Sequence, residues 1–390
     1  MKLCMLAGLW PPDVGGPATQ AWHLCRALRR AGVDVVVVSL GGPRGLASLD
    51  GVPVHRLGLQ GSYGWARRKA HWLEFAIALR RILARERPEI LHCHDVFLFS
   101  LMAGAIARAR GIPSVAKYAG DMVWEVVNAG SLRAPTFEAA YRADVKARLL
   151  YRLQRAGLRS FDLVWAASEY QRDRLLALGV PDRRIRVLPN LISLPQAEPA
   201  AADDASADDP PTVLTASRLV PHKRLELMLD VFARVGPPAR LTIVGDGPGD
   251  IRARLRARAA HLGLAGRVEL TGALPNPEVL RHMRRATVYA STSIWEGFGI
   301  VFVEAMAVGL PIVAMRVGAL PEVVPDGQAG YLVAPDDPAA MAARLRELLD
   351  DPGRRRTMAA FACGHARQFD IDAGLGRFLD LYRDARARAG

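Results

Sequence analysis

Short runs of β-branched and aliphatic residues recur along the first half of the chain, and longer amphipathic stretches separate them. The runs predict strands at Lys2–Leu6, Asp34–Ser39, Val52–Arg56, Glu89–His92, Pro113–Lys117, Leu163–Ala166 and Arg184–Leu188. Apolar residues at helical spacing predict helices that include Ala18–Arg30, Ala66–Arg85 and Ala139–Gly157. Strands that alternate with helices indicate a parallel sheet covered on both faces.

The same alternation returns after a segment with almost nothing to bury. Residues 193–211 are rich in Ala, Asp and Pro, which predicts a linker or surface excursion. Beyond it, strands are predicted at Thr212–Ala216, Arg240–Val244, Arg267–Thr271, Val288–Ser291, Pro311–Ala314 and Gly330–Val333. We therefore expect two doubly wound α/β domains, residues 1–192 and 212–370, facing each other across a cleft.

Composition supports this picture and adds an asymmetry. The 390 residues are 51% hydrophobic and 23% charged, as in soluble globular proteins. Residues 1–192 hold 28 of the 52 Lys and Arg but only 15 of the 39 Asp and Glu, so the whole net charge of +13 lies in the first half. This excess predicts an anionic partner for the first domain, and a general abundance of arginine is an equally weighted alternative.

Cysteine usage and hydropathy bear on the compartment. The four cysteines are scattered without metal-ligand or disulfide-framework spacing, which favours a reducing compartment. The apolar start of the chain is interpreted as a first strand and not as a signal peptide. The longest apolar stretch, Val96 to Ala107, is far shorter than the roughly 20 residues that span a bilayer. A cytoplasmic location is predicted, with peripheral contact at the inner face of the cell membrane as an option.

The strongest candidate chemistry lies in residues 296–304 of the second half, between a predicted strand and an apolar helix. A glycine-rich turn there, Gly297-Phe298-Gly299, leads to Ile300 at the start of the helix. The free amides of such a turn and the positive end of the helix dipole suit a diphosphate. Two carboxylates, Glu296 and Glu304, bracket the turn and offer acceptors for sugar hydroxyls.

Two further segments follow predicted strands of the second half. Arg218 and Lys223 come directly after the first of these strands, where cations can reach the same phosphates. The segment Val244-Gly245-Asp-Gly-Pro-Gly249 lacks the last glycine of a dinucleotide fingerprint, because position 250 is Asp. A Rossmann dehydrogenase is therefore disfavoured, and Gly245 is expected to approach a nucleotide or to shape a turn.

Taken together, these segments resemble glycosyltransferase family 4, whose members have the GT-B fold of two Rossmann-like domains. The order and spacing of the motifs carry this resemblance along nearly the whole chain: Gly15-Gly16, His92-Cys-His94-Asp95, Ala167-Ser-Glu169, Val187-Leu-Pro-Asn190, Ser217-Arg218 with Lys223, Gly245-Asp-Gly-Pro248, Glu296 with Glu304, and Gly318-Ala-Leu-Pro-Glu322. The resemblance also implies that the terminal helix, about 371–390, crosses back to the first domain.

The resemblance implies a role for each of these positions. Arg218 and Lys223 would neutralise the donor diphosphate, Glu304 would bind the ribose hydroxyls and Glu296 the hydroxyls of the donor sugar. Backbone amides from Gly297 to Ile300 would complete the phosphate site. Gly15 and Gly16 would let the first loop lie close to the phosphates.

The implied reaction is sugar transfer from a nucleoside-diphosphate sugar, most often UDP- or GDP-linked, with retention at the anomeric carbon. The protein would mainly stabilise the charge of the leaving group. No metal site and no cofactor are implied, and the nucleotide sugar is a substrate. The residues themselves do not exclude a double-displacement route.

One segment departs from the family pattern. Many members carry a histidine after the fifth strand of the first domain, and this chain has Tyr118 in the segment Lys117-Tyr-Ala-Gly-Asp121. Asp121 is still expected to meet the sugar or acceptor. A catalytic histidine does not transfer to this segment, and His94 is the nearby candidate.

The acceptor is assigned to the first domain by the resemblance. Residues 63–85 form a basic stretch edged by Trp and Phe, which is typical of a peripheral membrane contact or of an ordinary surface helix. We expect a glycan, glycolipid or cell-envelope acceptor, with a small soluble metabolite as the alternative and no nucleic acid partner. A phosphorylase, an epimerase and a non-catalytic sugar-nucleotide-binding protein are the competing classes.

Overall fold

The computed structural model of the chain describes residues 1–11, 16–59, 69–95, 99–195 and 210–389. The chain divides into two compact units, which we call unit 1 and unit 2. Unit 1 comprises Met1–Val127, Arg133–Ser193 and Asp370–Gly390, and unit 2 comprises Asn128–Leu132 and Leu194–Phe369. Most of the predicted linker, residues 196–209, lies outside the described residues.

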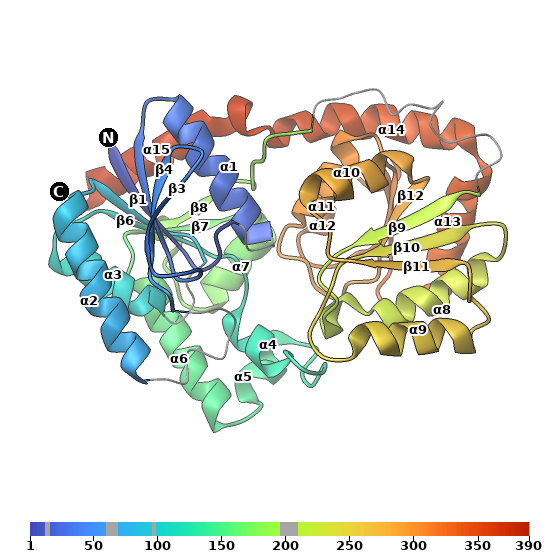
Figure 1. The fold of residues 1–390 in the computed structure, drawn as a ribbon, viewed down its shortest axis with the longest axis horizontal. Coiled ribbons are helices and arrows are strands. Elements are labelled where there is room, and N and C mark those ends of the chain that lie inside the picture. Colours follow the sequence, from blue (N-terminus) through green and yellow to red (C-terminus); the bar gives the residue numbers. More distant parts are fainter. Residues whose placement is uncertain (12–15, 60–68, 96–98, 196–209, 390) are drawn as a thin grey trace. The chain divides into compact units, whose positions relative to one another are not determined.

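Unit 1 is built on an eight-stranded sheet in the order β3-β4-β2-β1-β5-β6-β7-β8 (Figure 1). Its strands are β1 (Lys2–Ala7), β2 (Asp34–Ser39), β3 (Gly45–Leu49), β4 (Val52–Arg56), β5 (Ile90–Cys93), β6 (Ser114–Lys117), β7 (Leu163–Ala166) and β8 (Ile185–Val187). The seven predicted strands are confirmed and pair in parallel. The edge strand β3 was not predicted, and it runs antiparallel to β4.

Helices cover both faces of this sheet, because alternate strand residues point to opposite sides. The helices of unit 1 are α1 (Gly16–Arg30), α2 (Lys69–Glu86), α3 (Phe99–Ala109), α4 (Met122–Val127), α5 (Phe137–Arg142), α6 (Val145–Arg159), α7 (Glu169–Ala177) and α15 (Ile371–Ala389). Leu3 and Met5 of β1 pack with α1 and α15 on one face. Cys4 and Leu6 pack with α2 and α3 on the other face.

The predicted helix Ala139–Gly157 is wrong in one respect, because the structure breaks it in two. Helix α5 ends at Arg142, and Asp144 becomes the N-cap of α6, where its side chain accepts a hydrogen bond from the amide of Ala147 at 2.7 Å. An Asp at this position satisfies an amide that would otherwise lack a partner. The new helix start turns α6 onto the face of the sheet that α3 also covers.

Unit 2 is built on a six-stranded parallel sheet in the order β11-β10-β9-β12-β13-β14. Its strands are β9 (Thr212–Ala216), β10 (Arg240–Val244), β11 (Val268–Gly272), β12 (Val288–Ser291), β13 (Ile312–Met315) and β14 (Gly330–Val333). Its helices are α8 (Leu225–Val235), α9 (Ile251–His261), α10 (Asn276–Arg285), α11 (Ile300–Ala307), α12 (Leu320–Val323), α13 (Pro338–Asp350) and α14 (Pro352–Ala366). All six predicted strands are confirmed.

The last helix of the chain, α15, packs within unit 1 against α1. Its Tyr382 is fully buried, and the phenol oxygen lies 2.8 Å from Nδ1 of His92 on β5. Gly374 of α15 faces Leu191 so closely that a methyl group there would meet the leucine side chain at 2.3 Å. The C-terminal segment is thus part of the core of unit 1.

None of the four cysteines forms a disulfide within the described residues, and Cys4, Cys25 and Cys93 are buried. None of the helices in the described part of the chain is both long enough and apolar enough to cross a membrane.

Candidate functional site

The carboxyl edge of the unit-2 sheet brings Lys223 and Glu296 together from two different loops. Lys223 ends a short 3-10 turn, Pro221–Lys223, after β9, and Glu296 lies in the loop after β12. Nζ of Lys223 lies 2.6 Å from Oε1 of Glu296. The two side chains are only 16% and 10% exposed, so the ion pair is largely shielded from water. Removing one partner of a shielded pair costs more than breaking a surface salt bridge, because the other charge is left away from water.

Backbone hydrogen bonds hold these two loops in register. The hydroxyl of Thr292 lies 3.0 Å from the carbonyl oxygens of both Lys223 and Arg224. The amide of Ile294 donates to the carbonyl of His222 at 3.0 Å. The position of the Lys223 ammonium is therefore fixed by main-chain contacts as well as by Glu296.

A glycine after β13 fixes Glu296 from the other side. Gly318 has φ of 55°, and a Cβ there would lie 2.1 Å from the carbonyl oxygen of Glu296. The next amide, that of Ala319, donates to this same carbonyl at 2.9 Å. Only glycine allows the two backbones to approach so closely. Gly318 therefore lets the loop after β13 pack directly against the main chain of Glu296.

Helix α11 begins directly after this loop, as predicted. Gly299 is its N-cap with φ of 83°, and a Cβ there would meet the ring of Phe302 at 2.4 Å. The N-cap offers no side-chain acceptor to the first amides of the helix. Phe298 is buried with its ring against Phe369, so it contributes its backbone to the turn. The turn from Gly297 to Ile300 thus presents main-chain amides at a helix N-terminus, where an anion is favoured.

Glu304 lies one turn further along α11 and is only 8% exposed. Burial raises the pKa of its carboxyl from 4.5 to about 7, and a hydrogen bond from Asn276 opposes that shift. Nδ2 of Asn276, the first residue of α10, donates to Oε1 of Glu304 at 2.8 Å. The second carboxyl oxygen remains an acceptor for a ligand hydroxyl.

Glycines after β10 support the loop that carries Arg218. A Cβ on Gly245 would lie 1.9 Å from the carbonyl oxygen of Ser217, and one on Gly247 would lie 2.1 Å from that of Leu219. The amide of Leu219 donates to the carbonyl of Asp246 at 2.8 Å. Gly245 was predicted to approach a nucleotide or shape a turn, and its visible contact is with this loop. The side chain of Arg218 is exposed.

Unit 1 carries a second polar cluster at the carboxyl edge of its own sheet. Lys117 ends β6 and is 8% exposed. Its Nζ lies 3.3 Å from Oε1 of Gln20 and 3.3 Å from Nε2 of His94, and 4.4 Å from the centre of the Trp165 ring. Burial lowers the pKa of Lys117 to about 7, while nearby Asp95 opposes that shift. Such a cation is poised to change charge near neutral pH.

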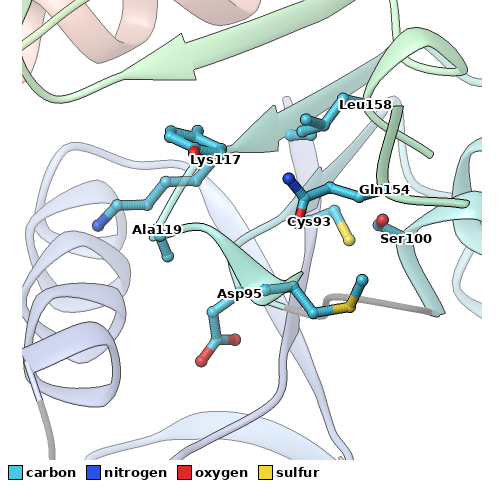
Figure 2. Close-up of a pocket in the computed structure, with 11 residues that line it drawn as sticks. Cys93, Asp95, Ser100, Lys117, Ala119, Gln154 and Leu158 are labelled. Atoms are coloured by element: carbon cyan, nitrogen blue, oxygen red, sulfur yellow. The ribbon is translucent and has the colours of Figure 1, made fainter. Parts of the chain in front are cut away.

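Asp95 follows β5 and is held by the loop after β1. The amide of Gly8 donates to Oδ1 of Asp95 at 2.5 Å. Burial raises the pKa of Asp95 to about 6, and the amides of Gly8 and Leu9 and the charge of Lys117 act against that shift. Asp95 and Lys117 line a small pocket of about 40 Å³ together with Tyr118, Ala119, Ser100 and Gln154 among others (Figure 2).

Asp121 is fully buried beside this pocket, and donors of unit 1 surround its carboxylate. The amide of Trp124 donates to Oδ1 at 2.9 Å, and Nε2 of Gln154 donates to Oδ2 at 3.0 Å. The hydroxyls of Tyr141 and Tyr118 also reach Oδ2. The carboxylate is thus engaged at the start of α4, and the expected contact of Asp121 with sugar or acceptor stays a prediction.

The remaining predicted residues divide between buried and exposed positions. His94 is fully buried, and burial together with Lys117 holds its pKa well below 6.5, so the ring is neutral. Gly16 is exposed and begins α1. Gly15 lies outside the described residues.

Three residues that hold the side chains of these two clusters in place were not assigned a role from the sequence. Asn276 reaches Glu304 across the sheet edge, and the signal available was only an Asn that begins a helix after a strand. Gly318 was quoted as part of a motif without a role. Lys117 stood in the departing segment, but its burial with Gln20 and His94 required the fold.

Comparison with known families supports one assignment for both units. Residues 198–363 match the family described as glycosyl transferases group 1, and residues 15–191 match the glycosyl transferase 4-like domain. The chain is 31% identical over 407 residues to a D-inositol 3-phosphate glycosyltransferase of Acidothermus cellulolyticus, covering 96% of this chain and 87% of that protein. It is 33% identical over 213 residues to a GDP-mannose-dependent phosphatidylinositol monomannoside mannosyltransferase of Mycolicibacterium smegmatis, covering 50% of this chain and 55% of that protein.

Solved structures show the same fold at lower identity. Sucrose-phosphate synthase from Thermosynechococcus elongatus superposes with a TM-score of 0.81 at 22% identity, covering 99% of both chains. Anabaena HepE in complex with UDP and glucose superposes with a TM-score of 0.75 at 20% identity, covering 98% of this chain and 100% of that one. With its two parallel-sheet units and these relatives, the chain belongs to glycosyltransferase family 4, and it is a glycosyltransferase of the GT-B fold.

Proposed function

We propose that this chain transfers a hexosyl group from a nucleoside-diphosphate sugar, UDP- or GDP-linked, to an acceptor hydroxyl with retention at the anomeric carbon. The observation that carries this proposal is the shielded pair of Lys223 and Glu296 at the edge of the unit-2 sheet. A cation for the leaving phosphate and an acceptor for sugar hydroxyls stand there side by side, next to the start of α11.

Each donor group has a partner of matching chemistry in unit 2. Lys223 and the exposed Arg218 are assigned to the diphosphate, together with the uncapped amides before Ile300. Glu304 is assigned to the ribose hydroxyls, because its second carboxyl oxygen can accept hydrogen bonds while Asn276 holds the first. Glu296 is assigned to hydroxyls of the donor sugar.

The proposed reaction needs one bond exchange at the anomeric carbon. The bond from C1 to the phosphate oxygen breaks, and the acceptor oxygen attacks from the face that the leaving group departs. The acceptor proton passes to the departing phosphate oxygen, so atoms and charges balance without a protein nucleophile. Lys223 and Arg218 would stabilise the charge that develops on the diphosphate. We assign this neutralisation to the two side chains and propose no resident cofactor.

The acceptor is assigned to the carboxyl edge of the unit-1 sheet, where Lys117 offers a cation and Asp95 an acceptor near neutral pH. We favour an acceptor presented on a glycolipid or cell-envelope glycan, which the likeness to the phosphatidylinositol monomannoside mannosyltransferase supports. The second candidate is a small soluble acceptor of the inositol phosphate type, which the likeness to the D-inositol 3-phosphate glycosyltransferase supports.

A nucleotide screen tests the donor half of the proposal. The melting temperature of the chain is measured with UDP, GDP and ADP and with their sugars, because a ligand of the folded state stabilises by mass action. We expect one nucleotide to raise the melting temperature at concentrations at which the other two have no effect. A flat response to every nucleotide would contradict the donor assignment.

A product analysis tests the transfer itself. The nucleotide sugar selected by the screen is incubated with inositol phosphate, with phosphatidylinositol vesicles or with no acceptor, and the anomeric configuration of the product is determined by NMR. We expect the new linkage to have the same anomeric configuration as the donor. Release of an isomerised nucleotide sugar without acceptor would indicate an epimerase. Donor binding without turnover against any acceptor would indicate a non-catalytic binding protein.

A further inference from the structure

Helices α2, α3 and α6 pack in sequence along one face of the unit-1 sheet and turn their outer sides to solvent (Figure 1). Phe75 and Leu79 of α2 fill the inner side, as do Phe99 and Ala103 of α3. All three helices run against the direction of the parallel strands. Their N-terminal ends therefore lie at the carboxyl edge of the sheet, where Asp95 and Lys117 line the pocket.

The outer side of this layer exposes aliphatic side chains at helical spacing. Leu73 and Ile77 of α2 are 65% and 41% exposed, and Val145 and Leu149 of α6 are 73% and 56% exposed. Each pair is separated by four residues, so its members lie on one side of their helix. All four belong to the N-terminal halves of their helices, so they mark the end of the layer that adjoins the pocket.

Cations surround these aliphatic residues without acidic partners. Arg80 and Arg81 follow on α2, and Lys146, Arg148 and Arg152 lie on α6. All five are exposed, and within the described residues none of their side chains has a hydrogen bond or an ion pair. The acidic residues of α2, Glu74 and Glu86, pair with Arg44 and Lys2, and the exposed Asp144 caps the start of α6. We call these five cations and the four aliphatic residues the docking face.

Some arginines elsewhere in the chain are paired with a carboxylate. Arg186 pairs with Asp384 at 3.0 Å, and Arg172 pairs with Asp182 at 2.9 Å. In unit 2, Arg258 pairs with Asp230 at 2.6 Å across two helices. Other exposed arginines, such as Arg377 and Arg388, have no carboxylate partner within the described residues, so the docking face is set apart by the exposed aliphatic residues that lie among its cations.

We propose that the docking face binds unit 1 to the anionic surface of a lipid bilayer. Unpaired cations attract acidic headgroups, and exposed aliphatic side chains on the same helices can enter the boundary between headgroups and acyl chains. A polyanion in solution would use the cations but would leave the aliphatic residues in water. The net charge of +13 in the first half of the chain acts in the same direction.

This docking does not depend on glycosyl transfer, but its consequence for the acceptor rests on the proposed function. Ser100 of α3 and Gln154 of α6 line the pocket that also contains Lys117. The pocket therefore lies against the same helices whose outer sides form the docking face. A lipid-linked acceptor would reach the carboxyl edge of the unit-1 sheet at the membrane surface, whereas a soluble acceptor would gain nothing from the docking.

Vesicle co-sedimentation tests the proposal. The full chain is mixed with vesicles of phosphatidylcholine alone or of phosphatidylcholine with about a third of phosphatidylglycerol. We expect binding to the anionic vesicles only, weakened by salt. Replacing Arg80, Arg81, Lys146, Arg148 and Arg152 by Gln should reduce the affinity at least about tenfold. A control variant changes exposed arginines outside this layer, Arg183, Arg377 and Arg388, and should stay within about twofold.

A second variant distinguishes a bilayer from another polyanion. Replacing Leu73, Ile77, Val145 and Leu149 by Ser keeps every charge and should lower vesicle affinity about fivefold, while heparin binding stays unchanged. If this variant sediments with vesicles like wild type, the aliphatic residues do not enter a bilayer and the proposal fails. Equal loss of affinity in the Arg183, Arg377 and Arg388 control would also overturn it.

Folding and donor binding are checked separately for each variant. The change in melting temperature on adding the nucleotide selected by the donor screen should match that of wild type. Retained vesicle binding by a chain that responds to no nucleotide would contradict the proposed function and leave the docking face intact. A wild-type chain that responds normally to the nucleotide but does not bind vesicles would contradict the docking face and leave the proposed function intact.

Discussion

Nζ of Lys223 lies 2.6 Å from Oε1 of Glu296, so the cation assigned to the donor diphosphate is also the ion-pair partner of the carboxylate assigned to the donor sugar. Sequence reasoning gave the two residues separate roles and did not foresee their contact. The pair holds both side chains in contact before any ligand binds. Preorganisation of this kind reduces the rearrangement needed on binding.

We expect the two side chains to be coupled energetically. Lys223→Met leaves the Glu296 carboxylate largely buried without its cation and should lower the free energy of unfolding by about 2 kcal/mol. Adding Glu296→Gln removes that unpaired charge. The loss of unfolding free energy in the double variant should therefore be about 1 kcal/mol smaller than the sum of the losses in the two single variants. Urea unfolding of the four proteins measures this coupling. Strict additivity would mean that the ion pair contributes nothing in solution.

Glu304 should make nucleotide binding depend on pH. Its pKa of about 7 means that the carboxyl is mostly protonated at pH 6 and ionised at pH 8. If the ionised form binds the ribose hydroxyls, the Kd for the nucleoside diphosphate should fall about tenfold between these pH values. Calorimetric titration of wild type and Glu304→Gln with the same nucleotide provides the measurement. The phosphate ionises in the same way in both titrations, so the difference between the two proteins reports on Glu304 alone. Parallel pH profiles would refute the role of Glu304.

The close approach of Gly318 to Glu296 can be tested with a matched pair of glycines. Gly318→Ala places a Cβ 2.1 Å from the carbonyl oxygen of Glu296, so the Glu296 loop must move. Gly327 also has positive φ, 76°, but nothing lies within 4 Å of a Cβ there. Both variants should lose about 1 kcal/mol of stability from backbone strain. Only Gly318→Ala should reduce the rate of transfer by about tenfold or more, on the order of the cost of misplacing a catalytic group.

Lys117 should give unit 1 a distinctive pH dependence of stability. Its pKa in the folded chain, about 7, lies below the usual 10.5. Between these two pH values the unfolded chain holds a proton that the folded chain lacks, so the free energy of unfolding rises with pH across this window. As the pH falls back toward 7, this gain in stability disappears. The rise is at most about 1.4 kcal/mol per pH unit.

Lys117→Met removes this titration and supplies the comparison. The lost contacts with Gln20 and His94 cost the same at every pH, so only the change of the stability difference with pH matters. We expect the advantage of wild type over the variant to grow between pH 7 and pH 9.5 in chemical denaturation. A difference that stays constant over that range would show that Lys117 remains protonated in the folded chain.

The regular elements of the fold follow closely from the sequence, because a parallel sheet buried on both faces leaves continuous aliphatic runs. Strand β3 escaped prediction since Gly45–Leu49 is a short, largely exposed edge strand that pairs only with β4. The only sequence signal for the break between α5 and α6 is one capping residue, Asp144. One polar residue in an otherwise periodic stretch is a weak signal against helix continuity.

The site was predictable in its residue types and less so in its contacts. The motif around Glu296 and Glu304 led to the correct loop and helix start. The partners of these carboxylates follow other strands: Asn276 begins α10 after β11, and Gly318 lies in the loop after β13. Such partners depend on the strand order, which sequence periodicity does not report. The four donors around Asp121 likewise became visible only in the folded unit.

Binding of the selected nucleoside diphosphate to Lys223→Met and Arg224→Met tests the central claim most directly. The two cations are neighbours in the chain, but Arg224 is engaged with Asp336 whereas Lys223 faces Glu296. We predict that Lys223→Met raises the Kd at least about tenfold, as expected for loss of a charge-assisted contact, and that Arg224→Met stays within about twofold. Equal affinities for wild type and Lys223→Met, or equal losses in both variants, would contradict a donor site at this edge of unit 2.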